Sequence, residues 1–166
     1  MASIFLKIDD NAEIKGEAKD QDHKDWIELA TVSWNHSRTI AAGVKSSQRS
    51  RGETFFNDIM IANTMHKGSM KVQQYAATGK VMKKVEIHFC RSGADGAKGL
   101  ETYLTIKLDD CLVTSYSTGI AGEDVPMETL SLNFTKVEME YKEADSKGVM
   151  KTASAFTFDK ETQSAA

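Results

Sequence analysis

The sequence predicts a mainly β domain: a barrel or two-sheet sandwich of about eight strands, with one short α-helix (about 69–78) docked on its side. Apolar residues recur with a period of two along most of the chain, and Gly-rich or charged turns separate these runs. A single segment, near residue 70, has the spacing of an amphipathic helix. The 166 residues fit one domain, 1–166, of ordinary size.

The N-terminal part contains three predicted strands. The first is short and includes residues 5–8, and the second covers 26–34, which is aromatic and β-branched at its ends. Residues 13–25 lie between them and are dense in charged side chains, so we expect a solvated loop. A third strand is expected within 54–65, where apolar and polar residues alternate weakly.

Residues 41–53, here called the arm, are small, polar and basic, with glycines near both ends. They have no core-facing period, so a long exposed connection is predicted. Loops of this length without secondary structure of their own are uncommon in compact domains and are often functional.

The predicted helix has a start, a buried stripe and an end. Ser69 can cap its first turn with the side-chain hydroxyl. Val72, Tyr75 and Ala76 fall at i, i+3 and i+4, which places them on one apolar face. Gly79 can adopt the left-handed conformation that ends a helix. A helix of about ten residues is marginal alone, so it should dock on a sheet.

The clearest strand follows the helix, with Val81, Val85, Ile87 and Phe89 on one face. A Gly-rich turn and a returning strand complete a hairpin.

The chain then continues as a strand over 111–118. From 130 to 134 the apolar residues stand at even positions, and from 137 to 141 they stand at odd positions. Either a bulge or a passage from one sheet to another explains this slip. A last strand is expected over 149–158, followed by a polar, frayed tail.

Composition excludes several classes of partner. The net charge of −3 argues against nucleic acid as a partner, since a phosphate binder carries a basic excess, and the basic segment 45–51 lacks aromatic stacking platforms. The N-terminal apolar run is interrupted by Lys7, so no signal peptide is expected, and no run is long enough for membrane insertion. The chain's own signals are those of a cytosolic protein.

Neither a metal nor another cofactor is expected. Cys90 and Cys111 lack zinc spacing and are expected to be unpaired thiols, although a redox pair or an intersubunit bridge is the alternative. The four histidines also lack metal-ligand spacing.

No catalytic residue is assigned, and the chain is not expected to be an enzyme. A hydrolase would have to use Ser117, His88 and Asp58, yet no GxSxG elbow presents the serine. A β protein offers such trios by chance.

Two further interpretations concern surfaces. Trp26 and Trp34, with Tyr116, would be stacking platforms in a carbohydrate-binding β-sandwich, although tryptophans so placed are more often core or interface aromatics. The only proline is Pro126, so long strand edges are left unguarded and invite pairing with another copy. The arm, too polar to fold on its own domain, would find its partner on a neighbouring molecule.

Several segments in order resemble the Hcp family of type VI secretion. The first are IFLKIDD, KGEAKD (Lys15 to Asp20), His23, Trp26-Ile27 and Val32-Ser33-Trp34. TFFNDIMIANTMHKGSMKVQQYAATGK resembles the family's strand and short helix ending in Gly-Lys. LVTSYST, Gly119, Gly122-Glu123-Asp124 and ETLSLNFTKVEMEY resemble its late strands.

The resemblance implies a structural subunit that forms six-membered rings, which stack into a hollow tube. A contractile sheath drives the tube, tipped by a spike protein, into a neighbouring cell, and small effector proteins travel in the lumen. The protein would therefore leave the bacterial cytoplasm without a signal peptide. Few residues follow Phe158, so a plain tube subunit without a fused toxin domain is expected.

The resemblance also implies two sites. Ser33 is the candidate for the lumen face. The inter-subunit or stacking loop consists of Gly43, Val44, Lys45, Ser46, Ser47, Gln48, Arg49, Ser50, Arg51 and Gly52.

Overall fold

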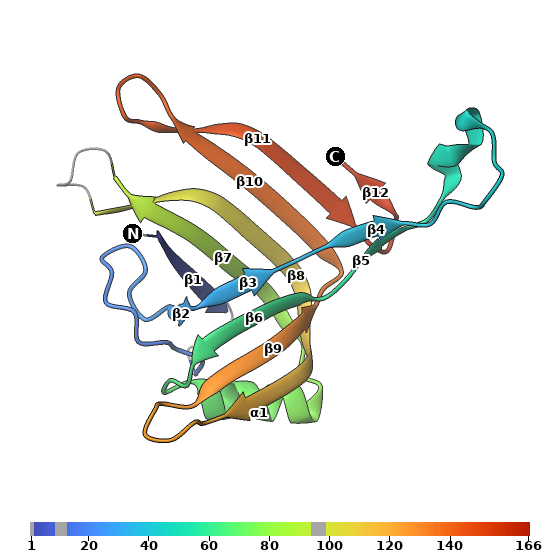
Figure 1. Cartoon of the computed structure of the whole chain (residues 1–166). Helices are drawn as coiled ribbons and strands as arrows, with labels where there is room; N and C mark the ends of the chain where they lie inside the picture. The colour runs from blue at the N-terminus through green and yellow to red at the C-terminus, as the bar shows by residue number, and fades with distance from the viewer. Residues whose placement is uncertain (1, 9–12, 94–98) are drawn as a thin grey trace.

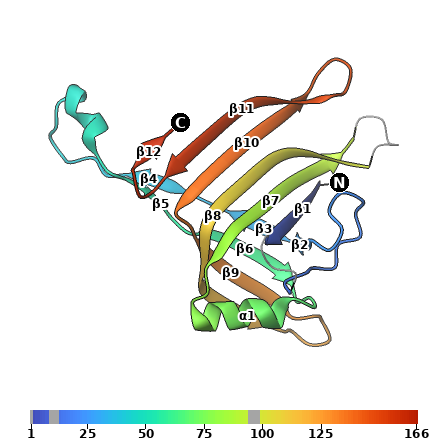
Figure 2. The same ribbon diagram turned by 180° about the vertical axis from the view of Figure 1, so that it is seen from behind.

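The computed structural model describes residues 2–8, 13–93 and 99–166. In these residues the strands form two linked sheets and a small separate hairpin, and one α-helix packs beside them (Figures 1 and 2). The first sheet has the order β12-β11-β10-β8-β7-β1-β2, and the second has β3-β6-β9-β8. All strand pairs are antiparallel. The strands are β1 (Ala2–Ile8), β2 (Ile27–Leu29), β3 (Thr31–Ser33), β4 (His36–Arg38), β5 (Thr54–Phe56), β6 (Ile59–Thr64), β7 (Met82–Ser92), β8 (Leu100–Gly119), β9 (Met127–Asn133), β10 (Lys136–Ala144), β11 (Met150–Asp159) and β12 (Ser164–Ala165).

Strand β8 joins the two sheets because it passes through both. Residues up to Cys111 pair with β7 and β10, whereas residues from Leu112 onward pair with β9. Asp110, at the crossing, has a φ of 49°, in the left-handed region. In Figure 1, β3, β6 and β9 lie side by side in front of β1, β7 and β8. The predicted mainly β fold with two packed sheets is confirmed.

The slip of phase within 129–141 marks a corner between the sheets. Strand β9 belongs to the second sheet and β10 to the first, with Phe134 and Thr135 between them. Phe134 is 2 % exposed, so the corner itself contributes to the core. The passage between sheets is therefore the correct alternative.

More strands are present than the sequence predicted, because β4 and β12 were not expected and the expected strands over 26–34 and 54–65, like that over 129–141, are each divided. Residues 26–34 form β2, which pairs with β1, and β3, which pairs with β6. Ala30 stands between them, and its N–H donates to the carbonyl of Ala62 at 2.8 Å. Likewise β5 pairs with β4, while β6 joins the second sheet.

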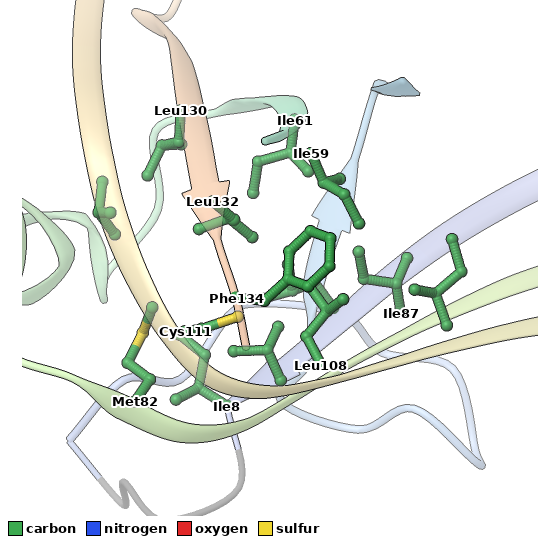
Figure 3. Packing of buried hydrophobic residues seen from close by; sticks show 14 of the residues in the cluster. Ile8, Ile59, Ile61, Met82, Ile87, Leu108, Cys111, Leu130, Leu132 and Phe134 are labelled. Carbon is green, nitrogen blue, oxygen red and sulfur yellow. The ribbon is translucent and has the colours of Figure 1, made fainter. Parts of the chain in front are cut away.

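The main core lies between the two sheets (Figure 3). The side chains of Ile87, Ile106, Leu108 and Val137 are fully buried there. Figure 3 shows Phe134 among side chains from both sheets. The expected core position of Val81 is wrong: it precedes β7, where the period of two does not hold, and it is 50 % exposed.

A second, smaller core lies on the opposite face of the first sheet. Phe5, Ala18 and Cys90 are its buried members, with Trp26 and Leu100 packed against them. The segment 13–25 covers this face, so the expectation of a solvated loop is wrong for its inner side chains.

Backbone hydrogen bonds close the segment 13–25 on itself and on Trp26. The N–H of Gly16 donates to the carbonyl of Asp25, and the N–H of Ala18 donates to that of Trp26. A β-carbon on Gly16 would lie 2.1 Å from the carbonyl oxygen of Trp26, which explains the glycine.

Helix α1 (Ser69–Thr78) has the predicted bounds, and Val72 and Tyr75 are buried as expected. Gly79 ends it at a φ of 67°, and its N–H donates to the carbonyl of Tyr75. The predicted Ser69 cap is wrong. Gly68 is the N-cap residue, and Ser69 already lies inside the helix with its hydroxyl directed at groups outside the first turn.

The polar tail is paired rather than frayed, which corrects the sequence expectation. Strand β12 pairs with β11, and the backbones of Ala166 and Thr157 exchange two hydrogen bonds of 2.9 Å. The arm also has secondary structure of its own, a 3-10 helix over Ser46–Arg51, instead of an irregular loop.

Candidate assembly surfaces

The arm projects away from the two sheets in both views (Figures 1 and 2). It is carried by the hairpin of β4 and β5, which forms a separate two-stranded sheet. Apart from Val44 and Gly52, every arm residue whose side chain the structure describes is exposed. The described surface is basic, since its exposed charged side chains are Lys45 and Arg49 against one acid, Glu53.

The base of the arm is held by a single side chain. Arg38 Nη1 donates to the carbonyls of Ser50 and Gly52, both at 2.7 Å. A β-carbon on Gly52 would collide with the carbonyl oxygen of Thr39 across the hairpin, so the close approach requires glycine. Both contacts hold the end of the 3-10 helix against the hairpin.

Apolar side chains accompany the basic ones. Ile40 is 48 % exposed and Phe55 is 45 % exposed, and both line an open hollow at the base of the arm together with Val44. A charged rim around exposed apolar residues is typical of a protein–protein contact.

Ser33 lies on a face of small polar side chains on the second sheet. Register places Ser33 opposite Met60, Met60 opposite Ser131, and Ser131 opposite Ser115. The hydroxyl of Ser115 donates to that of Ser131 at 2.8 Å. A neighbouring row, in the same register, contains Thr31, Ala62, Thr129 and Ser117.

This face is the one that points away from the main core. Intervening residues of the same strands, Ile61, Leu130 and Leu132, are buried in that core, and successive side chains of a strand point to opposite faces. Of the residues in the two rows, Met60 is the only large apolar one. We call these eight residues the polar face.

A buried carboxylate connects the second sheet to helix α1. Glu128, on β9, is 1 % exposed. Its Oε2 accepts hydrogen bonds from Asn63 Nδ2 at 2.7 Å and Ser69 Oγ at 2.8 Å. Its Oε1 accepts from the hydroxyl of Tyr116 at 2.5 Å. Three donors satisfy this charge within the protein.

The pKa values of Tyr116 and His66 are shifted by burial and by the nearby Glu128 carboxylate. Burial, together with the bond to Glu128, raises the pKa of Tyr116 to about 12, so the phenol remains a donor. Burial lowers the pKa of His66, although Glu128 opposes the effect. Because the N–H of Gly68 donates to His66 Nδ1, the ring proton is on Nε2, 4.0 Å from Glu128.

The trio considered for hydrolysis is not assembled. His88 bonds to Glu86 and His23, and Asp58 accepts from Thr114 and Asn133. Ser117 lies on the polar face instead.

The aromatic residues considered for sugar binding do not form one platform. Trp26 contacts His88, whereas Trp34 contacts Phe89, the next residue of β7, whose side chain points to the other face. Tyr116 is engaged with Glu128. Trp34 is 37 % exposed, so an interface role for it remains a prediction.

Cys90 and Cys111 are free and buried, and burial raises the pKa of Cys111 to about 12. Among the described residues, no group of three or more histidine, cysteine or acidic side chains is placed to hold a metal ion. Within the same residues, none of the helical structure is both long and apolar enough to cross a membrane.

Sequence reasoning did not identify Glu128, although a signal for it exists. Glu128 shares the even phase of Leu130, Leu132 and Phe134, so the pattern that placed those residues in the core also placed a carboxylate there. Its partners come from β6, β8 and α1 and could not be located without the fold.

Comparisons with known proteins agree on one family. The family model described as "Type VI secretion system effector, Hcp" matches residues 5–141. Protein hcp1 of Pseudomonas aeruginosa is 29 % identical over 141 residues, which cover 84 % of this chain and 82 % of the relative.

Solved structures agree with this match. Hcp1 from Salmonella typhimurium is 25 % identical, covers 99 % of both chains and has a TM-score of 0.74. A type VI secretion system effector from Yersinia pestis is also 25 % identical, covers 94 % of this chain and 98 % of its own, and has a TM-score of 0.68. A further type six secretion system protein, 22 % identical, has a TM-score of 0.85 over the full length of both chains and so shows the same fold.

Proposed function

Because the chain belongs to the Hcp family of type VI secretion proteins, we propose that it is a structural subunit of the inner tube of that system. In this role six copies close into a ring, and rings stack into a hollow tube. The observation that carries the proposal is the match of the family model to residues 5–141, most of the chain. The carbohydrate-binding alternative has no such support, since its three aromatic residues do not share a surface.

The polar face is the surface that we assign to the lumen. Its serine and threonine side chains offer hydrogen bonds without a strong field, and Met60 adds a limited apolar contact. A surface of this kind binds protein cargo weakly, which suits transient carriage of small effector proteins.

The arm is the element that we assign to contacts between rings. It projects from the domain, it is basic, and its base presents exposed Ile40 and Phe55. A contact between two different patches of identical subunits continues indefinitely along one axis, as a stacked tube requires.

The remaining partners follow from membership of the family. A spike protein at the tip and a contractile sheath around the tube would complete the machine, and the subunit would leave the bacterial cytoplasm with it. Neither nucleic acid nor membrane insertion has a part in this function, and bond-making chemistry is not expected of it.

The mass of the purified protein in solution tests the proposal. We expect size-exclusion chromatography with light scattering to give about 110 kDa, six times the 18.3 kDa chain. A larger value from stacked rings also agrees with a tube subunit. A strict monomer at high protein concentration would contradict the function.

A further inference from the structure

Two histidines face each other beneath the segment 13–25, between two carboxylates. His23 Nδ1 lies 2.6 Å from Asp20 Oδ2, and His23 Nε2 lies 2.9 Å from His88 Nδ1. His88 Nε2 lies 2.7 Å from Glu86 Oε1. The four side chains form an unbroken row from the segment to strand β7. His23 is 2 % exposed.

The row determines how many protons the two rings can hold. An ionised carboxylate only accepts, so His23 Nδ1 and His88 Nε2 must both carry hydrogen to bond their carboxylates. The two facing nitrogens then need one hydrogen between them to make their bond of 2.9 Å. The rings therefore carry three hydrogens in all, which is one more than two neutral imidazoles carry.

A different number of protons breaks the row. With two hydrogens, either the facing nitrogens present lone pairs to each other or one carboxylate loses its donor. With four hydrogens, both facing nitrogens are donors, and two cations lie side by side. We propose that His23 and His88 share a single added proton, and that uptake of a second proton releases the segment 13–25 from the first sheet.

The surroundings favour one positive charge. His23 stacks on the ring of Phe5 at 4.5 Å, and His88 lies 4.6 Å from the ring of Trp26, whose face attracts a cation. The other charged or titratable groups nearby are Asp22 of the segment, Glu28 of β2, Lys7 of β1, Cys90 of β7 and Lys107 of β8.

The pKa values of both carboxylates are lowered. The hydrogen bond from His88 lowers the pKa of Glu86, although burial opposes it. Burial raises the pKa of Asp20, but bonds from His23 and the N–H of Asp22 outweigh this effect and leave it lowered. Carboxylates with depressed pKa values stabilise the fold above about pH 4 and lose that contribution only as the pH falls through the folded values. A change between about pH 8 and pH 5 therefore reports on the histidines.

Hydrogen exchange of the assembled protein measures the release. The amides of Gly16, Ala18 and Asp25 donate to the carbonyls of Asp25, Trp26 and Ala18, and so close the loop that carries Asp20 and His23 over the sheet. Their protection factors, which correct for intrinsic exchange, should fall at least about tenfold from pH 8 to pH 5, as loss of one charge-assisted bond predicts. The amides of the β7–β8 ladder should keep their protection. A constant protection of the segment would overturn the proposal.

Two variants compare the pair with an exposed histidine. In His88→Gln the amide can still donate to Glu86 while its oxygen accepts from a charged His23, so protection should vary less than about twofold with pH. His36→Gln, at an exposed residue of β4, should behave as the wild type. A His88→Gln protein that still loses its segment at low pH would contradict the proposal.

If His88→Gln does not fold, NMR spectroscopy of the wild-type protein still tests the shared proton. With ¹⁵N-labelled histidine, three of the four ring nitrogens of the pair should carry hydrogen near neutral pH. Two hydrogens, or a zinc ion bound stoichiometrically between the rings and Cys90, would overturn the shared proton. Neither result bears on ring formation, so the proposed function is tested separately.

Discussion

Deletion of residues 48–52 should leave rings intact and abolish their stacking into tubes. The deletion removes most of the 3-10 helix at the tip of the arm. The main core lies between the two sheets and receives no residue from this segment, so the fold should persist. Electron microscopy should show separate rings where the wild type forms tubes, and the melting temperature should change by no more than a few degrees. Wild-type tube lengths from the deletion variant would refute the role of the arm.

A charge reversal separates the chemistry of the arm from its length. Lys45→Glu combined with Arg49→Glu keeps every backbone contact at the arm base, because Arg38 bonds only to backbone carbonyls there. Stacking should weaken, and the difference from the wild type should depend on salt because these charges are exposed. Lys147→Glu, in the exposed turn between β10 and β11, is the matched control and should assemble normally.

Glu128→Ala should lower the free energy of unfolding by about 3–5 kcal/mol. The substitution leaves the side chains of Asn63, Ser69 and Tyr116 without the carboxylate that they share. Asn63 and Ser69 are buried, so their donors would lose a partner away from solvent. Because folded domains are stable by only about 5–15 kcal/mol, this loss is large. Urea unfolding at one protein concentration measures it, since assembly also stabilises the folded state.

Two controls show whether the buried network is responsible. Glu123→Ala removes an exposed carboxylate from the loop before β9 and should change stability by less than about 0.5 kcal/mol. In Glu128→Gln the amide oxygen can still accept a hydrogen bond, but the amide NH₂ replaces the other acceptor and faces a donor. The loss in free energy of unfolding should therefore lie between those of Glu123→Ala and Glu128→Ala. A loss below about 1 kcal/mol for Glu128→Ala would mean that water replaces the carboxylate.

The sequence predicted the elements that depend on local patterns. Helix α1 and its stop at Gly79 follow from spacing and from one glycine, and both are present. The alternation at Val85, Ile87 and Phe89 places these residues in the core, as the structure does. A period of two is enough to assign such faces because each residue of a strand alternates in direction.

Features that depend on distant partners were outside the reach of these patterns. The charge content of the segment 13–25 predicts a solvated loop. In the structure Ala18 and His23 are buried, because they pack against residues of β1 and β7. The phase slip near residue 135 left a bulge and a corner as alternatives. The corner is decided by the pairing of β9 with β6 and of β10 with β11, and by their pairing with different halves of β8. The cap role of Ser69 was wrong because Gly68 is the N-cap residue, and the hydroxyl oxygen of Ser69 accepts from the N–H of His66 instead of from the first turn.

The assembly sites were predicted in part. The exposure of the arm followed from its composition, whereas its attachment through Arg38 needed the hairpin of β4 and β5. The family resemblance implied only Ser33 as a residue of the lumen face. The strand register shows that Ser33 lies in one row with Ser115 and Ser131. Its place in the lumen stays a prediction.

Negative-stain electron microscopy of the purified protein tests most directly whether the chain is a tube subunit. The proposed function, which rests on membership of the Hcp family, predicts annuli with sixfold symmetry and a stain-filled centre, alone or stacked end to end. Fields that contain only isolated globular particles, in every buffer and at high protein concentration, would contradict this account.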